Sequence, residues 1–357
     1  MLSFTLLDLV ALILIVIHFG VPLLYYRYLK TRYLNRPWSI RVDSRYRPRV
    51  SVIIPTYNEA KLIQKKLSNV LEQEYPRDKL EVIVVDSAST DETVEKVKEW
   101  RNKHLDLDLK LIQELERRGK ANALNTALKH VSGEIVIITD VDSLWLTSNT
   151  LNELAKWFAD PVVGAVSCLK NPSKSGVVSI EEGYRHYYNI LRLAESKAWS
   201  TPIFHGELAA FRKELLDTLG GFSTDIGADD SYTATKIALM GYRAIIPENI
   251  ACMEIVPQNG YHSWRIRRAQ HLIQHFLKTL GTKPKTNKTF KQILYTEAYL
   301  HLINPWILLI ATTLLLITSI IMGSILAMTL LTIGISLLIY KPYRTWITTQ
   351  IYLIIAT

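Results

Sequence analysis

The stretch Glu134-Ile-Val-Ile-Ile-Thr-Asp-Val-Asp142 decides the fold, because a short apolar run ends in two carboxylates that stand one residue apart. The run 135–139 has the length and composition of a buried strand. Ligands of open α/β sheets bind at the carboxyl ends of strands. Mg²⁺ takes few protein carboxylates and completes its shell with water and substrate phosphates. Two readings stay open here: a metal site that holds a nucleotide diphosphate, or a polar strand end that opens a turn.

Short apolar strands alternate with helices before this stretch, which predicts a mostly parallel sheet. We expect strands at 50–54, 82–85, 109–112 and 135–139, and helices at 59–73, 91–103 and 121–130, with Thr90 as a cap. Polar residues follow three of these strands, and in a parallel sheet such ends line one crevice. The chain has no G-x-G-x-x-G and no G-x-x-x-x-G-K-[ST], which argues against a dinucleotide-binding Rossmann site and a P-loop NTPase.

The hydrophobic residues are concentrated at the two ends of the chain. Of 357 residues 48% are hydrophobic and 21% are charged, and the mean hydropathy is +0.10. Ranges 9–26, 298–340 and 345–357 contain no charged residue. A bilayer span needs about 20 apolar residues. We therefore expect one span near the N-terminus and two in 298–340, with a turn at Gly323-Ser324. The last run is short for a span, and either stops inside a helix or lies at the interface.

Positive charge sets the expected orientation in the membrane. Eight lysine or arginine residues follow the first apolar run between Arg27 and Arg49, against the single acid Asp43. No basic residue precedes that run and no small-residue cleavage site follows it, so a signal anchor is favoured over a signal peptide. The positive-inside rule puts the N-terminus outside and residues 28 onward in the cytoplasm, and Lys341 and Arg344 agree.

The net charge of +9 does not indicate nucleic-acid binding, because the basic residues gather beside the spans, where anionic headgroups attract them. The two cysteines, Cys168 and Cys252, support neither a disulfide framework nor a zinc cluster. We expect a multi-pass protein of the cell membrane with its α/β domain in the cytoplasm.

Six motifs in order resemble the inverting glycosyltransferases of family 2, which have a GT-A fold and include polyprenyl-phosphate sugar synthases and polysaccharide synthases. The motifs are Ile53-Ile-Pro-Thr-Tyr-Asn-Glu59, Val82-Ile-Val-Val-Asp-Ser-Ala-Ser-Thr-Asp91, Gly119-Lys-Ala-Asn-Ala-Leu-Asn125, Asp140-Val-Asp142, His205-Gly206 and Gly227-Ala-Asp-Asp230. The resemblance spans residues 49 to 274. It implies a UDP- or GDP-sugar donor, Mg²⁺ or Mn²⁺ as cofactor, and inversion at the anomeric carbon.

The resemblance also implies roles for residues on the donor side. Asp86 contacts the nucleoside, with Pro55, Thr56 and Glu59 at the border of the same pocket. Asp86 also fits a turn or cap residue, and Glu59 also fits a charge that complements a helix dipole. Lys120 contacts the donor, although Arg117 and Arg118 beside it also fit a solvated basic run.

Asp142 is the first candidate for the metal, and Asp140 faces the sugar or ribose or supports the metal. Asp230 is the candidate base that takes the proton of the acceptor hydroxyl. Asp229 fits helix charge better, since anions are favoured at helix N-termini. His205 and Gly206, with Glu207, are expected on the acceptor side together with Asp229.

One segment departs from the polymerising members, which carry Gln-x-x-Arg-Trp on a helix. Here Trp264 stands at the Gln position, Arg267 at the Arg position and Arg268 at the Trp position. This departure argues against a stacking platform for a growing sugar chain, while both arginines remain available to the donor diphosphate. The apolar stripe Leu272–Leu280 fits a helix on the membrane surface or an ordinary amphipathic helix packed on the sheet.

These observations divide the chain into five expected parts: an N-terminal anchor (1–27), a basic linker (28–48), a GT-A catalytic domain (49–258), amphipathic interfacial helices (259–297) and C-terminal transmembrane helices (298–357). We expect a metal-dependent transferase that moves a sugar to a membrane lipid or lipid-linked acceptor. A processive synthase of the cellulose or hyaluronan type is the alternative. A non-catalytic scaffold would have lost the acids, and a nucleotidyltransferase would carry a Gly-rich triphosphate loop after the first strand.

Overall fold

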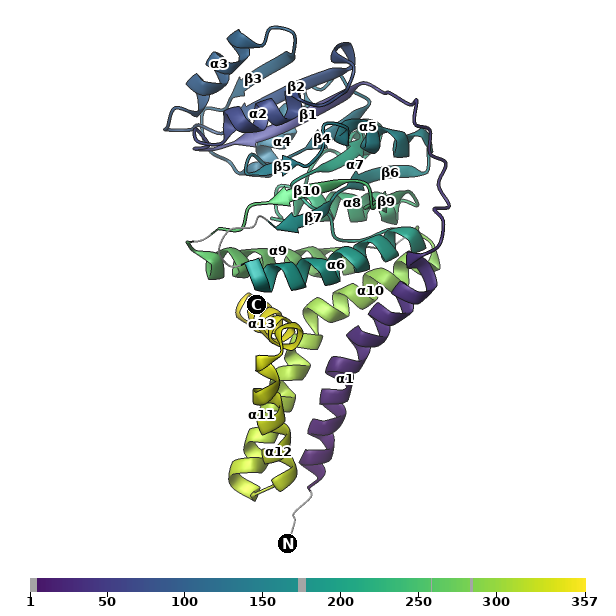
Figure 1. Cartoon of the computed structure of the whole chain (residues 1–357), viewed down its shortest axis with the longest axis vertical. Coiled ribbons are helices and arrows are strands. Elements are labelled where there is room, and N and C mark those ends of the chain that lie inside the picture. Colours follow the sequence, from purple (N-terminus) through teal and green to yellow (C-terminus); the bar gives the residue numbers. More distant parts are fainter. Residues whose placement is uncertain (1–4, 173–177, 258, 283–284) are drawn as a thin grey trace.

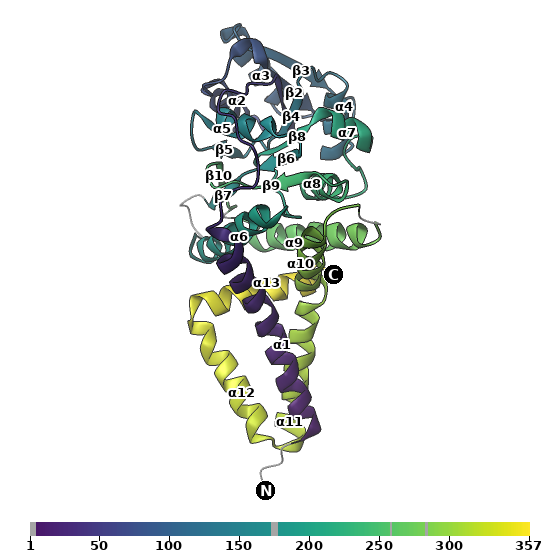
Figure 2. The same ribbon diagram turned by 90° about the vertical axis from the view of Figure 1, so that its right-hand side faces the viewer.

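The computed structural model describes residues 5–172, 178–257, 259–282 and 285–357. An α/β domain lies at one end of the molecule and a stem of long helices at the other. Helices α6 (Val178–Ala198) and α9 (Tyr261–Leu280) lie crosswise between them (Figure 1). Helices α1 (Leu6–Leu29) and α13 (Lys341–Ile355) both belong to the stem side (Figure 2).

Two sheets form the α/β domain in the part of the chain that the structure describes. The larger has the order β3-β2-β1-β4-β8-β6-β9, and its strands are β1 Val50–Thr56, β2 Leu80–Asp86, β3 Asp108–Gln113, β4 Ile135–Ile138, β6 Val163–Ser167, β8 Ala209–Arg212 and β9 Arg243–Ile245. Strands β1 to β4 are parallel, and β8 is antiparallel to both neighbours. The smaller sheet joins β5 Ser143–Trp145, β10 Ala251–Glu254 and β7 Leu169–Pro172. This mixed, GT-A-like sheet confirms the expected fold class.

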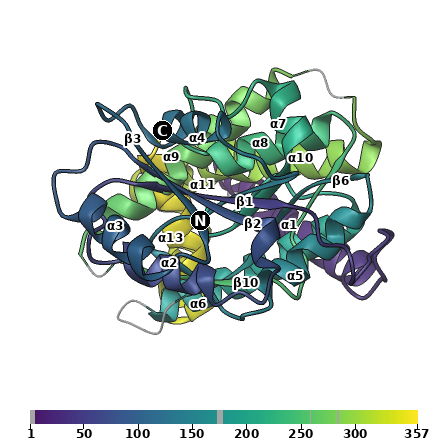
Figure 3. The same ribbon diagram turned by 90° about the horizontal axis from the view of Figure 1, so that it is seen from above.

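Strands β2 and β4 bury both faces, as their continuous apolar runs require, while the edge strand β3 is only partly buried. In β1, Val52 and Ile54 pack on one side while Ile53 packs on the other. Helices α2 Ile63–Leu71, α3 Thr93–Lys103 and α5 Thr150–Ala155 cover the first face, and α4 Lys120–Leu128, α7 Lys213–Leu219 and α8 Asp229–Leu239 cover the second (Figure 3).

Helix α2 begins at Ile63, four residues later than the sequence pattern predicts. The backbone N–H of Glu59 donates to Thr93 Oγ1 at 2.8 Å and that of Ala60 donates to Asp91 Oδ2 at 3.2 Å, so the loop after β2 holds this segment outside the helix. Thr90 is not a helix cap: its N–H donates to Asn58 Oδ1 at 2.8 Å, and Glu92 occupies the cap position of α3. Long-range side-chain contacts thus set both boundaries.

The stem consists of α1 Leu6–Leu29, which continues as a π-helix Lys30–Leu34, and of α10 Lys288–Leu302, α11 Asn304–Met322 and α12 Ile325–Ser336. Within the described ranges, segments Leu6–Leu34 and Lys288–Met322 are long and apolar enough to cross a membrane. Gly323 ends α11 in the left-handed conformation and the Ser324 side chain caps α12, which confirms the expected turn.

The chain bends by 107° after Ile339, and α13 Lys341–Ile355 then runs across the stem (Figure 2). This geometry favours the interfacial reading of the last apolar run. Helix α13 packs against α6 Val178–Ala198 and α9 Tyr261–Leu280. Most of the α9 stripe packs on protein, because Phe276 lies in the core and Ile273 contacts α13, while Leu277 stays exposed. Leu280 is exposed as well, and the placement of α9 at the membrane surface stays a prediction.

Candidate active site

A cavity of about 870 Å³ lies between the carboxyl ends of the strands and helix α9. It collects residues that are far apart in the sequence. The predicted site residues that line it are Pro55, Thr56, Glu59, Lys120, Asp140, Asp142, His205, Gly206, Asp229, Asp230, Arg267 and Arg268. The motifs of the sequence therefore meet in one chamber.

Asp86 does not line this cavity. Its buried carboxylate accepts hydrogen bonds from the Ser89 backbone at 3.0 Å and the Ser89 hydroxyl at 2.5 Å, and a third from Thr56 at 3.3 Å. The turn after β2 thus engages both carboxylate oxygens, as the turn reading of Asp86 requires. The neighbouring Ser87 does line the cavity.

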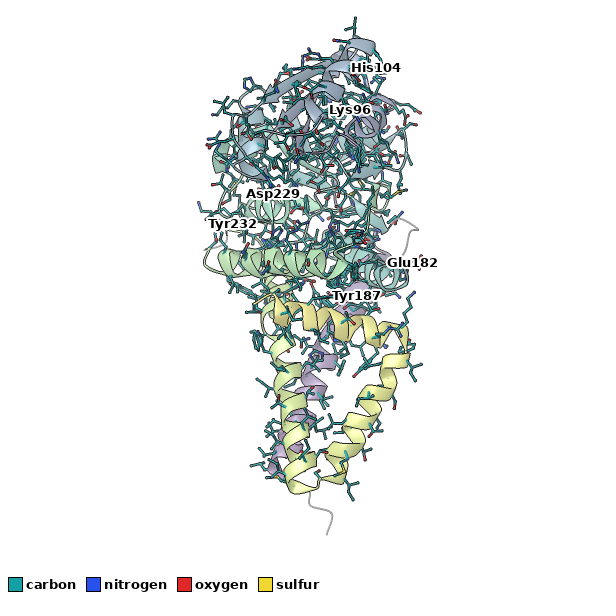
Figure 4. The ribbon with its side chains drawn as sticks, turned by 90° about the vertical axis from the view of Figure 1, so that its left-hand side faces the viewer. Lys96, His104, Glu182, Tyr187, Asp229 and Tyr232 are labelled. Carbon is teal, nitrogen blue, oxygen red and sulfur yellow. The ribbon has the colours of Figure 1, made fainter. Side chains whose placement is uncertain are left out.

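Lys120 joins two of the acidic motifs. Gly119, with φ +94°, ends the preceding loop, and Lys120 begins α4. Its Nζ lies 2.8 Å from Asp140 Oδ1 and 3.5 Å from Asp229 Oδ2. Burial alone would lower the pKa of Lys120, but the two carboxylates raise it well above its usual value. The same pairing outweighs burial at Asp140 and lowers the pKa of that carboxyl. Asp229 faces the cavity from the α8 terminus, above α9 (Figure 4).

Asp142 and Glu59 have no cationic partner among the residues that the structure describes. Burial and then Asp140 raise the pKa of Asp142 to about 6, and burial and then Asp142 raise the pKa of Glu59 to about 7. A divalent cation bound here would balance the negative charge of these two carboxylates. No cluster of three or more His, Cys, Asp or Glu side chains converges within the described ranges. One or two carboxylates with donor phosphates are the ligand set that Mg²⁺ commonly uses.

Asp230 is half-buried at the start of α8, where its Oδ1 accepts the Ser231 N–H at 2.6 Å. Burial and then the charge of Asp229 raise the pKa of Asp230 to about 7. A carboxyl that titrates near neutral pH is suited to proton transfer. Both acids of the pair sit in the first turn of α8, as predicted, and only Asp229 also contacts Lys120.

The loop at His205-Gly206 approaches the acids closely. A Cβ on Gly206 would lie 2.6 Å from Asp140 Oδ2, so only glycine leaves room for that carboxylate. The backbone of Gly206 also accepts the Asp140 N–H at 3.0 Å. His205 is buried, and burial together with Lys170 and Arg185 lowers its pKa well below the usual value. The imidazole is therefore neutral, and burial of this side chain fits a structural role as well as contact with the acceptor.

The two arginines of α9 differ in their surroundings. Arg268 pairs with Glu254 and lies over the Trp264 ring, 4.6 Å from its centre. Arg267 is exposed at the cavity and has no carboxylate partner among the described residues. Arg267 is thus the freer of the two to meet a diphosphate.

Comparison with known proteins agrees with this geometry. The sequence profile "Glycosyl transferase family 2" matches residues 51–220. The solved structure "Mannosyltransferase PcManGT from Pyrobaculum calidifontis in complex with GDP-Man and Mn2+" is 58% identical, with a TM-score of 0.92 over 98% of this chain and 97% of that chain. The chain belongs to glycosyl transferase family 2. It is a nucleotide-sugar glycosyltransferase, and the expected Mg²⁺ or Mn²⁺ agrees with the Mn²⁺ of that complex.

More distant relatives of this family 2 glycosyltransferase include polysaccharide synthases. "Poly-beta-1,6-N-acetyl-D-glucosamine synthase" of Staphylococcus epidermidis is 28% identical over 312 residues, which are 85% of this chain and 74% of the relative. The structure "S. aureus TarS 1-349 in complex with UDP-GlcNAc" is 20% identical, covers 85% of this chain and 90% of that chain with a TM-score of 0.54, and shows the shared fold.

Sequence reasoning missed a buried ionic network beside the glycosyltransferase site. Glu254, at the end of β10, accepts hydrogen bonds from Arg185 at 2.6 Å and from Lys170 at 3.2 Å. Lys170 also pairs with Glu207 at 2.7 Å. The sequence feature that could have indicated Glu254 is its position as an acidic residue at the end of a strand. Nothing in the pattern of α6 marked Arg185, because its partner is 69 residues away.

Proposed function

We propose that this protein transfers one mannose from GDP-mannose to a lipid or lipid-linked acceptor at the membrane surface, with Mn²⁺ as cofactor and inversion at the anomeric carbon. The single observation that carries the proposal is the continuity of the cavity. It extends from the acids at the strand ends to Thr349, Tyr352 and Leu353 of α13. The 58% identity to a mannosyltransferase solved with GDP-Man and Mn²⁺ supports the choice of donor.

On the donor side, Pro55, Thr56 and the loop at Ser87 border the nucleoside, and Arg267 meets the diphosphate. Asp86 acts indirectly, because its carboxylate holds the turn after β2 in place. Asp142, supported by Asp140, would hold the divalent cation, which would neutralise charge on the departing nucleotide. Lys120 fixes Asp140 and Asp229 at the edge of the sugar site through its two ion pairs.

On the acceptor side, Asp230 takes the proton of the acceptor hydroxyl. The hydroxyl oxygen bonds to the anomeric carbon, the bond from that carbon to the diphosphate oxygen breaks, and the nucleoside diphosphate leaves with the electron pair. Attack from the face opposite the leaving group inverts the configuration. Gly206 leaves space for the Asp140 carboxylate at the edge of this site.

A processive polysaccharide synthase is the second candidate, because a relative 28% identical over 85% of this chain makes a polymer. The departure at Trp264, Arg267 and Arg268 argues against it. Arg268 occupies the Trp position and is bound to Glu254, so the ring of that position is replaced by a guanidinium beside Trp264. Within the described ranges, two helical segments could cross a membrane, or three if the bent pair Ile325–Ile339 and Lys341–Ile355 is one span. Two or three spans make a thin conduit for a polymer.

The test is transfer of radiolabel from a panel of UDP- and GDP-sugars to native membrane lipids by the full chain in nanodiscs. We expect label from GDP-mannose in the lipid extract, one residue per acceptor, only with Mn²⁺ or Mg²⁺. A water-soluble polymer would support the synthase instead. Absence of transfer from every donor would contradict both candidates.

A further inference from the structure

Lys66, on helix α2, is a fully buried lysine that the proposed reaction does not use. Among the residues that the structure describes, no carboxylate forms an ion pair with it, and its ammonium donates only to Ser143. Lysine is almost never fully buried unless it is paired. An ammonium that leaves water without a charged partner costs much free energy. The burial of Lys66 therefore needs a physical reason.

The partners of Lys66 lie in the turn at residues 140–143, which we call the metal turn. Its Nζ donates to the Ser143 carbonyl at 3.0 Å and to the Ser143 hydroxyl at 3.2 Å, and it lies 5.1 Å from the centre of the Trp145 ring. The Ser143 hydroxyl in turn donates to the Asp140 carbonyl at 2.8 Å. A chain of hydrogen bonds therefore runs from α2 through Ser143 to Asp140, and Asp142 lies within the turn that it closes.

Lys66 and Asp142 also line the same small cavity, whose volume of about 10 Å³ is close to the room of one water molecule. Burial lowers the pKa of Lys66 to about 8, and the charges of Asp140 and Asp142 act against this shift. The ammonium is therefore charged at neutral pH. A fixed positive charge thus lies close to Asp142 without forming an ion pair with it.

A lysine in this place has two opposite effects on a metal site. Its hydrogen bonds hold the metal turn, so the carboxylate of Asp142 is already arranged for a ligand. Its charge repels a divalent cation, and this repulsion is strong where the dielectric constant is low. A nucleotide diphosphate brings negative charge and phosphate oxygens, with which Mg²⁺ commonly completes its shell. The repulsion therefore weakens binding of the metal ion alone more than binding of the metal ion together with the donor.

We propose that Lys66 is a positioning residue of the metal site, which fixes the metal turn and makes firm Mn²⁺ binding depend on the donor diphosphate. The inference rests on the metal role of Asp142 in the proposed function, and it goes beyond that role because it states when the cofactor binds. Lys66 does not line the main cavity, so it acts through Ser143 and through its charge.

The test measures Mn²⁺ binding to the full chain in nanodiscs of neutral lipid, from the paramagnetic resonance signal of free Mn²⁺. Calorimetric titration of GDP at several Mn²⁺ concentrations measures the coupling, because GDP changes the affinity for Mn²⁺ by the same factor as Mn²⁺ changes the affinity for GDP. In the wild type, GDP affinity should rise steeply with Mn²⁺, while Mn²⁺ alone should bind weakly.

Lys66→Met keeps an unbranched side chain and removes the charge. This variant should bind Mn²⁺ alone at least about tenfold more tightly than the wild type, and its GDP affinity should depend less on Mn²⁺. A merely structural role predicts the opposite, since a damaged turn weakens the site. Unchanged or weaker Mn²⁺ binding by folded Lys66→Met would overturn the inference. Lys66→Gln, which is also neutral, serves if Lys66→Met does not fold.

Two further variants locate the effect. Lys66→Met combined with Asp142→Asn should lose the gain in Mn²⁺ affinity, and a gain that persists without Asp142 would also overturn the inference. Lys61→Met is the matched control, because Lys61 is exposed just before α2 and lines neither cavity. It should bind Mn²⁺ as the wild type does.

Failure of the proposed function gives a different result. If Mn²⁺ binds the wild type neither alone nor with GDP, the metal role of Asp142 fails together with the inference. If Mn²⁺ binds the wild type equally tightly with and without GDP, and Asp142→Asn abolishes this binding, only the role of Lys66 fails. That result requires no Lys66 variant.

Discussion

At the scale of single residues, the acids of the cavity fall into two groups. Asp140 and Glu254 have cationic partners, which lower the pKa of each carboxyl. Glu59, Asp142 and Asp230 have no cationic partner among the described residues, and burial raises the pKa of each to between about 6 and about 7. Ionisable groups in a cleft whose pKa values are strongly shifted are candidates for functional residues. Here the unpaired carboxylates are the ones available to a metal ion and to a proton.

Asp142→Asn should abolish Mn²⁺-dependent donor binding while the protein stays folded, because the amide keeps the volume and loses the charge. Calorimetric titration of GDP-mannose with and without Mn²⁺ measures this. Asp106→Asn, at an exposed site far from the cavity, is the control. Full transfer activity in excess chelator would refute the metal assignment.

The pH dependence follows from Asp230, whose pKa is raised from 3.8 to about 7. A base must be ionised, so turnover should rise as the pH increases through about 7 and then level off. The folded state binds this proton more tightly than the unfolded state. The stability it contributes is therefore present at low pH and is lost as the pH rises through about 7.

The melting temperature of the wild type should therefore fall between about pH 5 and about pH 8, and that of Asp230→Asn should fall less over the same range. Initial rates and thermal melts across this range check both statements. A flat rate profile through neutral pH, or equal slopes of melting temperature in the two proteins, would count against this role of Asp230.

At the scale of elements, Asn125 ties α4 to the loop that leads into α8. Its Nδ2 donates to the Phe222 carbonyl at 2.8 Å, and its Oδ1 accepts the Phe222 N–H at 2.8 Å. Asn125→Ala leaves both backbone groups unsatisfied and should lower stability by about 1–3 kcal/mol. Turnover should fall too, since the loop leads into the first turn of α8, which carries Asp229 and Asp230. Denaturant melts beside initial rates test this. The exposed Asn102→Ala should change neither, and an unaffected Asn125→Ala would show that the loop is held elsewhere.

The local sequence pattern was sufficient to predict the parallel strands, because the runs at Val50, Val82 and Ile135 are short, apolar and followed by turn residues. It was also sufficient for the Gly323-Ser324 turn and for the acids that meet in the cavity. The start of α2, the antiparallel β8 and the small sheet β5-β10-β7 depend on contacts between residues distant in the chain. The turn held by Asp86 and the Arg185–Glu254 pair depend on three-dimensional packing in the same way.

At the scale of the whole molecule, helix α13 runs across the stem (Figure 2). Its residues Thr349, Tyr352 and Leu353 line the cavity, so the cavity opens toward the expected bilayer surface. The basic residues between Arg27 and Arg49 favour a cytoplasmic α/β domain. Leu6→Cys, at the exposed start of α1, should then react with an impermeant maleimide on intact cells. Leu115→Cys, on the α/β domain, should react only after permeabilisation. Cys168 and Cys252 are buried and leave a low background. The reverse labelling would overturn the orientation.

The proposed reaction combines a metal-held donor, a membrane-side acceptor and one carboxylate that takes the proton. The most direct measurement compares wild type, Asp230→Asn and Asp229→Asn by Mn²⁺-dependent mannose transfer at saturating acceptor, beside donor affinity and thermal melts of each. Asp230→Asn should keep donor affinity within a few-fold and lower turnover by about 10²–10⁴. Asp229→Asn should cost less turnover. Near-normal turnover in Asp230→Asn, or greater damage in Asp229→Asn, would contradict the account.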